Sequence, residues 1–163
     1  MRNKILSKNF LKSLLWKQNK HHKHGVLIHT LRVVYYTAKN KDWKLIPAAF
    51  FHDIGKPFVA YQKEKDIINN EFSFTDHEEY SYQIIKNWSF LSNYTKDMTR
   101  YHYLLRDVYL CKKKGKMERY KEKKEIWDSL SKEYHEDLER FLSYDDMGKG
   151  YGSKQTDKIK ENK

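Results

Sequence analysis

The sequence LIPAAFFHDIGKP, residues 45–57, contains an apolar helical pattern that ends in a histidine and an aspartate. One helical face, spaced i, i+3, i+4 and i+7, is formed by Leu45, Ala48, Ala49 and His52. A glycine and a proline follow, and both residue types commonly lie at or beyond helix ends. The stretch therefore predicts a helix over 42–53 whose buried face ends in His52, with Asp53 directly after it.

Four other expected helices also direct a metal-ligating side chain toward the core. By the same period, these side chains share faces with apolar residues: His29 in 25–39, His77 in 75–88, His102 in 94–110 and Asp145 in 125–146. Burial of one unpaired imidazolium or carboxylate is costly, and a single such residue is usually a satisfied core side chain. Six together are better explained by a shared metal ion, for which imidazole and carboxylate suit Mn, Fe, Co, Ni or Zn.

The composition favours an all-α protein. The chain has 163 residues, enough for one domain, and 15% of them are aromatic, which argues against disorder. Only 6 Gly and 2 Pro are present, so a single-domain bundle of about six helices is expected. Cys111 is the one cysteine, and no apolar run could cross a membrane. A cytoplasmic protein without membrane contact is therefore expected.

The chain divides into three expected parts. Residues 1–20 predict a basic amphipathic region with a helix over 7–18, residues 21–148 the helical domain, and residues 149–163 a disordered basic tail. Within the domain, 58–74 are expected to form a loop and 111–124 a basic insert, either loop or frayed helix. A capping-box pattern, Thr75-Asp76-His77-Glu78, opens the following helix. The clustered histidines are interpreted as a solvated connector, with a supporting phosphate contact as the alternative: His21, His22 and His24.

Three stretches resemble the HD-domain superfamily of metal-dependent phosphohydrolases. They are His29-Thr30-Leu31-Arg32-Val33, His52-Asp53-Ile54-Gly55-Lys56-Pro57 and Tyr144-Asp145. With Phe74-Thr75-Asp76-His77 and Tyr101-His102, the set looks most similar to the small HD domains of bacterial tRNA nucleotidyltransferases. The resemblance covers roughly residues 24–148. It implies a helical domain that cleaves phosphate esters with metal-activated water, and it says little about the substrate.

The resemblance also implies a ligand set. One divalent ion (Mn, Fe, Co, Ni, Mg or Zn) would be bound by His29, His52, Asp53 and Asp145. His77 and His102 would line the site or hold a second ion bridged by Asp53. Asp146 competes with Asp145 for the last position, and the helical spacing from Leu138, Phe141 and Leu142 favours Asp145.

Two basic residues and one acidic residue are candidates for a catalytic role. Lys56 follows the His-Asp pair and is expected to contact a phosphate oxygen. The alternative is a lysine at the C-terminus of its helix, where the helix dipole favours a positive charge. Arg32 lies one turn after His29 and is expected either to bind phosphate or to form a salt bridge with Asp53 or Glu78. Asp53 is a bridging ligand or a base.

The positive charge lies at the periphery of the expected domain. The net charge is +11, and residues 1–20 contain six basic and no acidic residues. Residues 111–124 contain eight basic and two acidic residues, so we expect phosphate or nucleic-acid binding by Lys112, Lys113, Lys114 and Lys116. A solvated lysine-rich surface is the other interpretation.

The sequence therefore predicts hydrolysis of a phosphate ester of a nucleotide or of an RNA or DNA end. The alternative is a nucleic-acid-binding or regulatory module built on the same scaffold. The sequence does not indicate an oligomeric state.

Overall fold

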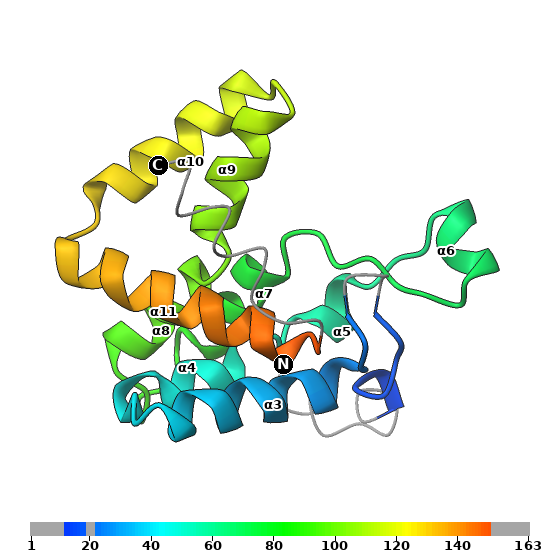
Figure 1. The fold of residues 1–163 in the computed structure, drawn as a ribbon, viewed down its shortest axis with the longest axis horizontal. Coiled ribbons are helices and arrows are strands. Elements are labelled where there is room, and N and C mark those ends of the chain that lie inside the picture. The colour runs from blue at the N-terminus through cyan, green and yellow to red at the C-terminus, as the bar shows by residue number, and fades with distance from the viewer. Residues whose placement is uncertain (1–11, 19–21, 151–163) are drawn as a thin grey trace.

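The computed structural model describes residues 12–18 and 22–150, and within them the chain is helical, without strands beyond isolated bridges. Figure 1 shows the arrangement. The elements, in chain order, are α3 (Val26–Lys39), η1 (Trp43–Leu45), α4 (Ile46–Phe51), α5 (Lys56–Val59), α6 (Glu64–Ile68), α7 (His77–Ile85), α8 (Asn93–Tyr101), α9 (Leu104–Lys113), α10 (Met117–Ser129) and α11 (Lys132–Gly148). The all-α prediction is confirmed. Among the described helices none is long and apolar enough to cross a membrane.

The main core lies between α3, α4, α8 and α11. Helix α3 packs along α11 and against α4, and α4 also contacts α8. The fully buried side chains at this contact include Val33, Ala48, Met98, Leu138 and Phe141. Full burial of a valine, leucine, methionine or phenylalanine side chain stabilises the fold by roughly 1.5–3 kcal/mol, and that of an alanine by less. A smaller cluster around Ile84 and Ile85 joins α7 to the turn after α4.

Two elements project from this core. Helices α9 and α10 pack against each other as a hairpin that extends above α11 and α3 in Figure 1. The base of the hairpin is anchored by Leu104, Leu105 and Trp127, all buried in the main core. The segment around α6 extends separately, to the right in Figure 1. It is closed at its base by backbone hydrogen bonds between Tyr61 and Ser73.

The helix boundaries differ from the sequence predictions. Of the helix expected over 7–18, residues 14–18 are not helical, Lys17 and Gln18 form bridges to Gly25 and Phe72, and residues 1–11 lie outside the description. The loop expected over 58–74 contains α6 and the end of α5. The insert 111–124 is mostly helical, as the end of α9 and most of α10. The tail expected to start at 149 begins with a buried Lys149, and residues 151–163 are not described.

Three expected long helices are interrupted. The helix over 42–53 is divided into η1 and α4, with Pro47 in the first turn of α4. The helix over 94–110 breaks at His102, whose Nδ1 lies 2.7 Å from the Thr99 carbonyl oxygen and so competes for a helix acceptor. The segment 125–146 breaks where Ser131 caps α11 by accepting a hydrogen bond from the Tyr134 N–H.

The expected capping box at α7 does not form. The N-cap residue Asp76 has a left-handed backbone (φ 57°), and its side chain makes no capping hydrogen bond. Aspartate tolerates this conformation better than most residues. Its carboxylate contacts Arg119 instead.

The turn after α4 lies directly against α7. The Gly55 N–H donates to Ser81 Oγ (2.9 Å), and the Ser81 hydroxyl donates to the His52 carbonyl (2.7 Å). A Cβ on Gly55 would lie 2.5 Å from the Ser81 nitrogen and 2.6 Å from the His77 carbonyl oxygen. This glycine is therefore required by the close approach of two backbones.

We expect Gly55→Ala to destabilise the protein by about 1–3 kcal/mol, because the two backbones must separate to admit the methyl group. Thermal unfolding followed by circular dichroism measures this change. The matched control is Gly115→Asn, since Gly115 has a left-handed φ of 66° that asparagine tolerates and no atom lies within 4 Å of an added Cβ. Equal destabilisation by the two substitutions would contradict the prediction.

Candidate metal centre

Six metal-ligating side chains converge at the centre of the bundle. Asp53 lies between the imidazoles: its Oδ2 is 3.3 Å from His29 Nε2 and 3.1 Å from His52 Nε2, and its Oδ1 is 3.2 Å from His77 Nε2. Asp145 Oδ1 lies 3.0 Å from His29 Nε2. All six are at most 9% exposed: His29, His52, Asp53, His77, His102 and Asp145. The structure thus brings together the ligands proposed from the sequence.

Five of the six side chains form two groups that share Asp53, and Asp145 lies beside the first group through its contact with His29. One consists of His29, His52 and Asp53 and the other of Asp53, His77 and His102, and within each group the ligand atoms lie within 4.8 Å of one another. Two such groups match the expectation of one or two ions. Both groups bring imidazole and carboxylate donors together, as first-row divalent metals prefer.

Three of the imidazoles are oriented by their own backbone. The Nδ1 atoms of His52, His77 and His102 lie 2.8, 2.9 and 2.7 Å from the carbonyl oxygens three residues earlier in the chain. A carbonyl can only accept, so Nδ1 carries the proton, and in a neutral ring Nε2 is left with a lone pair. Nδ1–H bonded to a carbonyl, with Nε2 directed at the site, is the arrangement usual for metal-bound histidine.

The centre has the chemistry of a cation site. His29 Nε2 and His52 Nε2 face each other at 3.3 Å beside the Asp53 carboxylate. Neither oxygen of Asp53 accepts a hydrogen bond of normal geometry, although both are buried. The Lys56 ammonium lies close to this carboxylate, with its Nζ 2.7 Å from Asp53 Oδ2, and a divalent cation between the imidazoles and the carboxylate would satisfy the remaining lone pairs. The residues therefore fit the metal implied by the sequence.

The charges around the centre favour the ligating forms of both carboxylates. Burial alone would raise the pKa of Asp53, but His52 and Lys56 outweigh it and hold this pKa well below its ordinary value. Asp145 behaves in the same way, with Lys149 and His29 opposing burial and lowering its pKa. Burial, reinforced by His52, lowers the pKa of His102, which keeps the imidazole neutral.

The structure separates the two adjacent aspartates of α11. Asp145 faces His29, whereas the buried Asp146 accepts from Arg106 Nη2 at 2.5 Å and from Lys149 Nζ at 2.7 Å. Asp146 therefore compensates two buried cations and does not face the imidazoles. The helical spacing that favoured Asp145 agrees with this geometry.

Lys56 lies beside Asp53, at the first residue of α5 and not at the end of a helix as the alternative interpretation required. It is 4% exposed, and its Nζ lies 2.7 Å from Asp53 Oδ2 and donates to Gln18 Oε1 at 2.6 Å. Gln18 is itself fully buried, and the sequence contains no sign of this position, because Gln18 is the last residue of the helix expected over 7–18. Lys149 has a similar role, because its Nζ lies 2.7 Å from Asp145 Oδ2.

Arg32 is not brought to the centre. Its Nε donates to the Gly148 carbonyl at 3.2 Å and its Nη2 to the Tyr36 hydroxyl at 3.2 Å, so the guanidinium binds the end of α11. It pairs with neither Asp53 nor Glu78. Glu78 instead lies 3.1 Å from His77 Nδ1.

His22 is a site residue that the sequence interpretation missed. It was assigned to a solvated connector, but its ring packs edge-on to His29 with centroids 5.0 Å apart and lines the pocket described next. Burial, together with Lys56, lowers its pKa well below the ordinary value, so the imidazole is neutral. No spacing to an apolar stripe marks it, and it reaches the site through the turn before α3. His21 lies outside the described residues.

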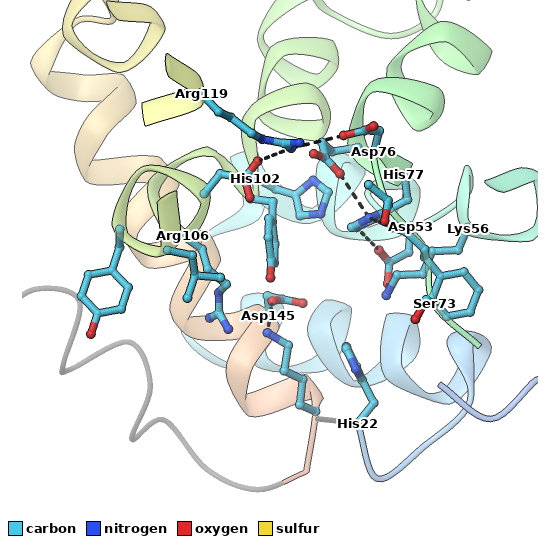
Figure 2. A pocket seen from close by; sticks show the side chains of 18 of the residues that line it. His22, Asp53, Lys56, Ser73, Asp76, His77, His102, Arg106, Arg119 and Asp145 are labelled. Atoms are coloured by element: carbon cyan, nitrogen blue, oxygen red, sulfur yellow. Dashed lines mark hydrogen bonds and ion pairs between the residues drawn. The ribbon is translucent and has the colours of Figure 1, made fainter. Parts of the chain in front are cut away.

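A pocket of about 750 Å³ opens onto the metal centre, and Figure 2 shows its lining side chains. That volume is within the range of pockets for small molecules. Asp53, His77, His102 and Asp145 form part of its surface, and the hairpin of α9 and α10 forms another part. The lining cations are Lys56, Lys63, Arg106, Lys113, Lys114, Arg119 and Lys149. Of the four lysines proposed for phosphate binding, Lys113 and Lys114 line the pocket, whereas Lys112 and Lys116 are exposed and do not.

We expect a divalent ion to stabilise the folded protein, because the ligands come together only in the native state. An ion at a concentration one hundred times its Kd adds about 2.7 kcal/mol. For a domain of this size, that corresponds to a rise in Tm of roughly 5–10 °C. Calorimetry of EDTA-treated protein with and without added Mn²⁺ measures the shift. An unchanged Tm with Mn²⁺, Co²⁺, Ni²⁺, Zn²⁺ and Mg²⁺ would contradict the site.

Comparison with known proteins agrees with the HD-domain resemblance of the sequence. Residues 26–139 match the family model described as HD domain. No curated protein and no solved structure matches. The closer resemblance to the HD domains of tRNA nucleotidyltransferases is not confirmed. Asp145 lies beyond the end of the family match, so its place in the ligand set depends on the geometry of α11.

Proposed function

Because the chain belongs to the HD domain family, whose superfamily comprises metal-dependent phosphohydrolases, we propose that it hydrolyses a phosphate ester of a nucleotide or of a nucleic-acid end. The observation that carries this proposal is the position of Asp53. It is shared by two groups of candidate metal ligands and forms part of a pocket whose lining includes seven lysine and arginine side chains. A phosphate group entering this pocket would meet ligands and positive charge together.

The chain's own residues supply binding and orientation. His29, His52, Asp53 and Asp145 would hold one divalent ion, and His77 and His102 would hold a second with Asp53. A divalent cation at such a site activates water as a nucleophile and neutralises charge on the phosphoryl group. The bonds from Nδ1 to backbone carbonyls keep three imidazole rings directed at the centre before substrate arrives.

We assign two roles to Lys56. Its ammonium fixes the Asp53 carboxylate at 2.7 Å, and it lies in the pocket wall, where it would pair with a phosphate oxygen of the substrate. Gln18 keeps the ammonium in place at 2.6 Å. Arg32 has no corresponding role, because its guanidinium is bound to the end of α11.

The experiment is a substrate panel with purified protein. Nucleoside monophosphates, 2′,3′-cyclic nucleotides and bis-(p-nitrophenyl) phosphate are each incubated with Mn²⁺, Co²⁺, Ni²⁺ or Mg²⁺, and released phosphate or p-nitrophenol is measured. We expect turnover of at least one ester, with loss on EDTA treatment and recovery on adding metal. Turnover that resists EDTA, or full activity of His52→Ala, would overturn the proposal.

A second candidate function is nucleic-acid binding by the projecting hairpin. Its support is the exposed run Lys112, Lys113, Lys114 and Lys116 at the end of the hairpin, away from the main core. Binding of single-stranded RNA at increasing salt tests it. Each phosphate contact removed by neutralising one of these lysines should make the slope of log K against log salt less steep by about 0.7. An unchanged slope would exclude this function.

A further inference from the structure

The pocket wall formed by α9 and α10 carries cations that do not contact the metal ligands. Lys113 is the last residue of α9, Lys114 is its C-cap, and Arg119 lies in the first turn of α10. In Figure 2, Arg119 extends from α10 across the upper side of the pocket toward Asp76, with Asp145 and His22 on the lower side. A ligand that reaches from the metal centre to this wall would meet a second region of positive charge.

Arg119 is held in a position from which it can bind an anion. Its Nη2 donates to Asp107 Oδ2 at 3.1 Å and to Asp76 Oδ1 at 3.3 Å. Both contacts use the same nitrogen, so among the described residues Nε and Nη1 have no hydrogen-bond partner. Guanidinium groups with free N–H donors bind phosphate oxygens well. The side chain is 40% exposed, which leaves it accessible from the pocket.

The contact with Asp76 is one that an entering anion could replace. The Asp76 side chain is 62% exposed, and ion pairs between exposed groups are weak and screened by salt. The contact with Asp107, whose side chain is 15% exposed, is better shielded. Arg119 would therefore stay anchored to α9 through Asp107 when Asp76 is displaced.

Resting on the proposed function, we propose that Arg119, with Lys113 and Lys114, forms a subsite for a second phosphate group of the substrate. The phosphate to be hydrolysed lies at the metal centre, and the second lies at the α9–α10 wall. The pocket of about 750 Å³ is the size of a small-molecule site, and the three cations line it, unlike Lys112 and Lys116. These observations favour a compact substrate with two phosphates, such as a nucleoside bisphosphate, over a long nucleic-acid strand.

The test compares adenosine 5′-monophosphate with adenosine 3′,5′-bisphosphate. Calorimetric titration in EDTA gives a Kd for each without turnover. We expect the bisphosphate to bind about tenfold more tightly, as one charge-assisted hydrogen bond would give. Arg119→Gln should remove most of this difference and leave the monophosphate unchanged. The matched control is Lys121→Gln, an exposed lysine of α10 that does not line the pocket and should change neither Kd.

The variant Asp76→Asn distinguishes phosphate binding by Arg119 from a purely structural role of its ion pair with Asp76. If Arg119 binds the second phosphate, the loss of the competing carboxylate should tighten bisphosphate binding, the opposite of Arg119→Gln. If Arg119 only ties α10 to the loop before α7, both variants should lower the Tm and affect both nucleotides alike, and the proposal is overturned. Equal Kd values for the two nucleotides in the wild-type protein would also overturn it.

Failure of the proposed function gives a different result. In that case neither nucleotide is hydrolysed with any metal, while the difference in Kd and its dependence on Arg119 persist. A single-stranded RNA of about 20 nucleotides is the third ligand in the same titration. It is longer than the roughly 4–16 nucleotides that one single-strand binding groove covers. Tighter binding of the RNA than of the bisphosphate, lost equally in Lys112→Gln and Arg119→Gln, would favour the outer hairpin surface and overturn a subsite inside the pocket.

Discussion

Asp53→Asn should lower the rate of phosphate-ester hydrolysis by at least about 100-fold, the upper range of effects seen when even an outer partner of a metal ligand is lost. The reason is that this carboxylate belongs to both groups of candidate ligands, one with His29 and His52 and one with His77 and His102. An amide has no charge and offers only one oxygen, so both groups are weakened together. Initial rates with Mn²⁺ and the metal content of the dialysed protein measure the effect.

The control for this substitution is Asp128→Asn. Asp128 is exposed and contacts Lys124 on α10. The same change of charge there should leave activity and metal content unaltered. Because Asp53 also compensates the buried Lys56, the variant is examined for helix content before its activity is interpreted. Retained metal content and activity in a folded Asp53→Asn protein would contradict the assignment.

The second large effect distinguishes two neighbouring aspartates of α11, because Asp145 is expected to affect metal binding and Asp146 to affect stability. Asp145→Asn should lose metal at the site formed with His29 and lose activity by a factor of about 100 or more. Asp146→Asn should instead destabilise the fold by roughly 3–5 kcal/mol, because Arg106 and Lys149 are buried cations that it compensates. The folded fraction of Asp146→Asn should bind metal normally.

Two measurements distinguish these outcomes. Metal content after dialysis reports on ligation, and urea unfolding of the metal-free protein reports on stability. Asp145→Asn is expected to change the metal content more than the stability. Asp146→Asn is expected to change the stability more than the metal content. The reverse assignment would place Asp146 in the ligand set.

The burial and convergence of the candidate ligands could be predicted from the sequence, because each of them ends or interrupts an apolar helical face. His29, His77 and His102 share faces with core residues at helical spacing, and the structure buries all three. The helix expected over 25–39 is observed as α3, Val26–Lys39. These features depend on local periodicity, which is visible in a single sequence.

Helix ends were predicted poorly near the ligands. His52 and His102 bind backbone carbonyls three residues earlier, and so compete with the helix hydrogen bonds that would continue through them. A periodic pattern does not register this competition, and the segments over 42–53 and 94–110 therefore appeared continuous. Ser131 did offer a local signal, a serine able to cap α11.

The partners of the ligands could not be predicted from the sequence. Lys149 and Gln18 lie at opposite ends of the described chain, yet each contacts a group at the centre. Lys149 pairs with Asp145 at i, i+4, a spacing visible in the sequence, but it belongs to the segment expected to form a disordered tail. The position of Gln18 depends on how the segment before α3 packs, and no local pattern specifies that packing. His22 was misassigned for the same reason.

The ligands are spread from α3 to α11, and this affects when the site can exist during protein synthesis. As the chain leaves the ribosome, α3 to α8 bring His29, His52, Asp53 and His77 before α11 has been made. Contacts between residues so distant in sequence form late, since the intervening chain must first close into a loop. We therefore expect the complete set of candidate ligands, which includes Asp145, to assemble only after α11 has emerged.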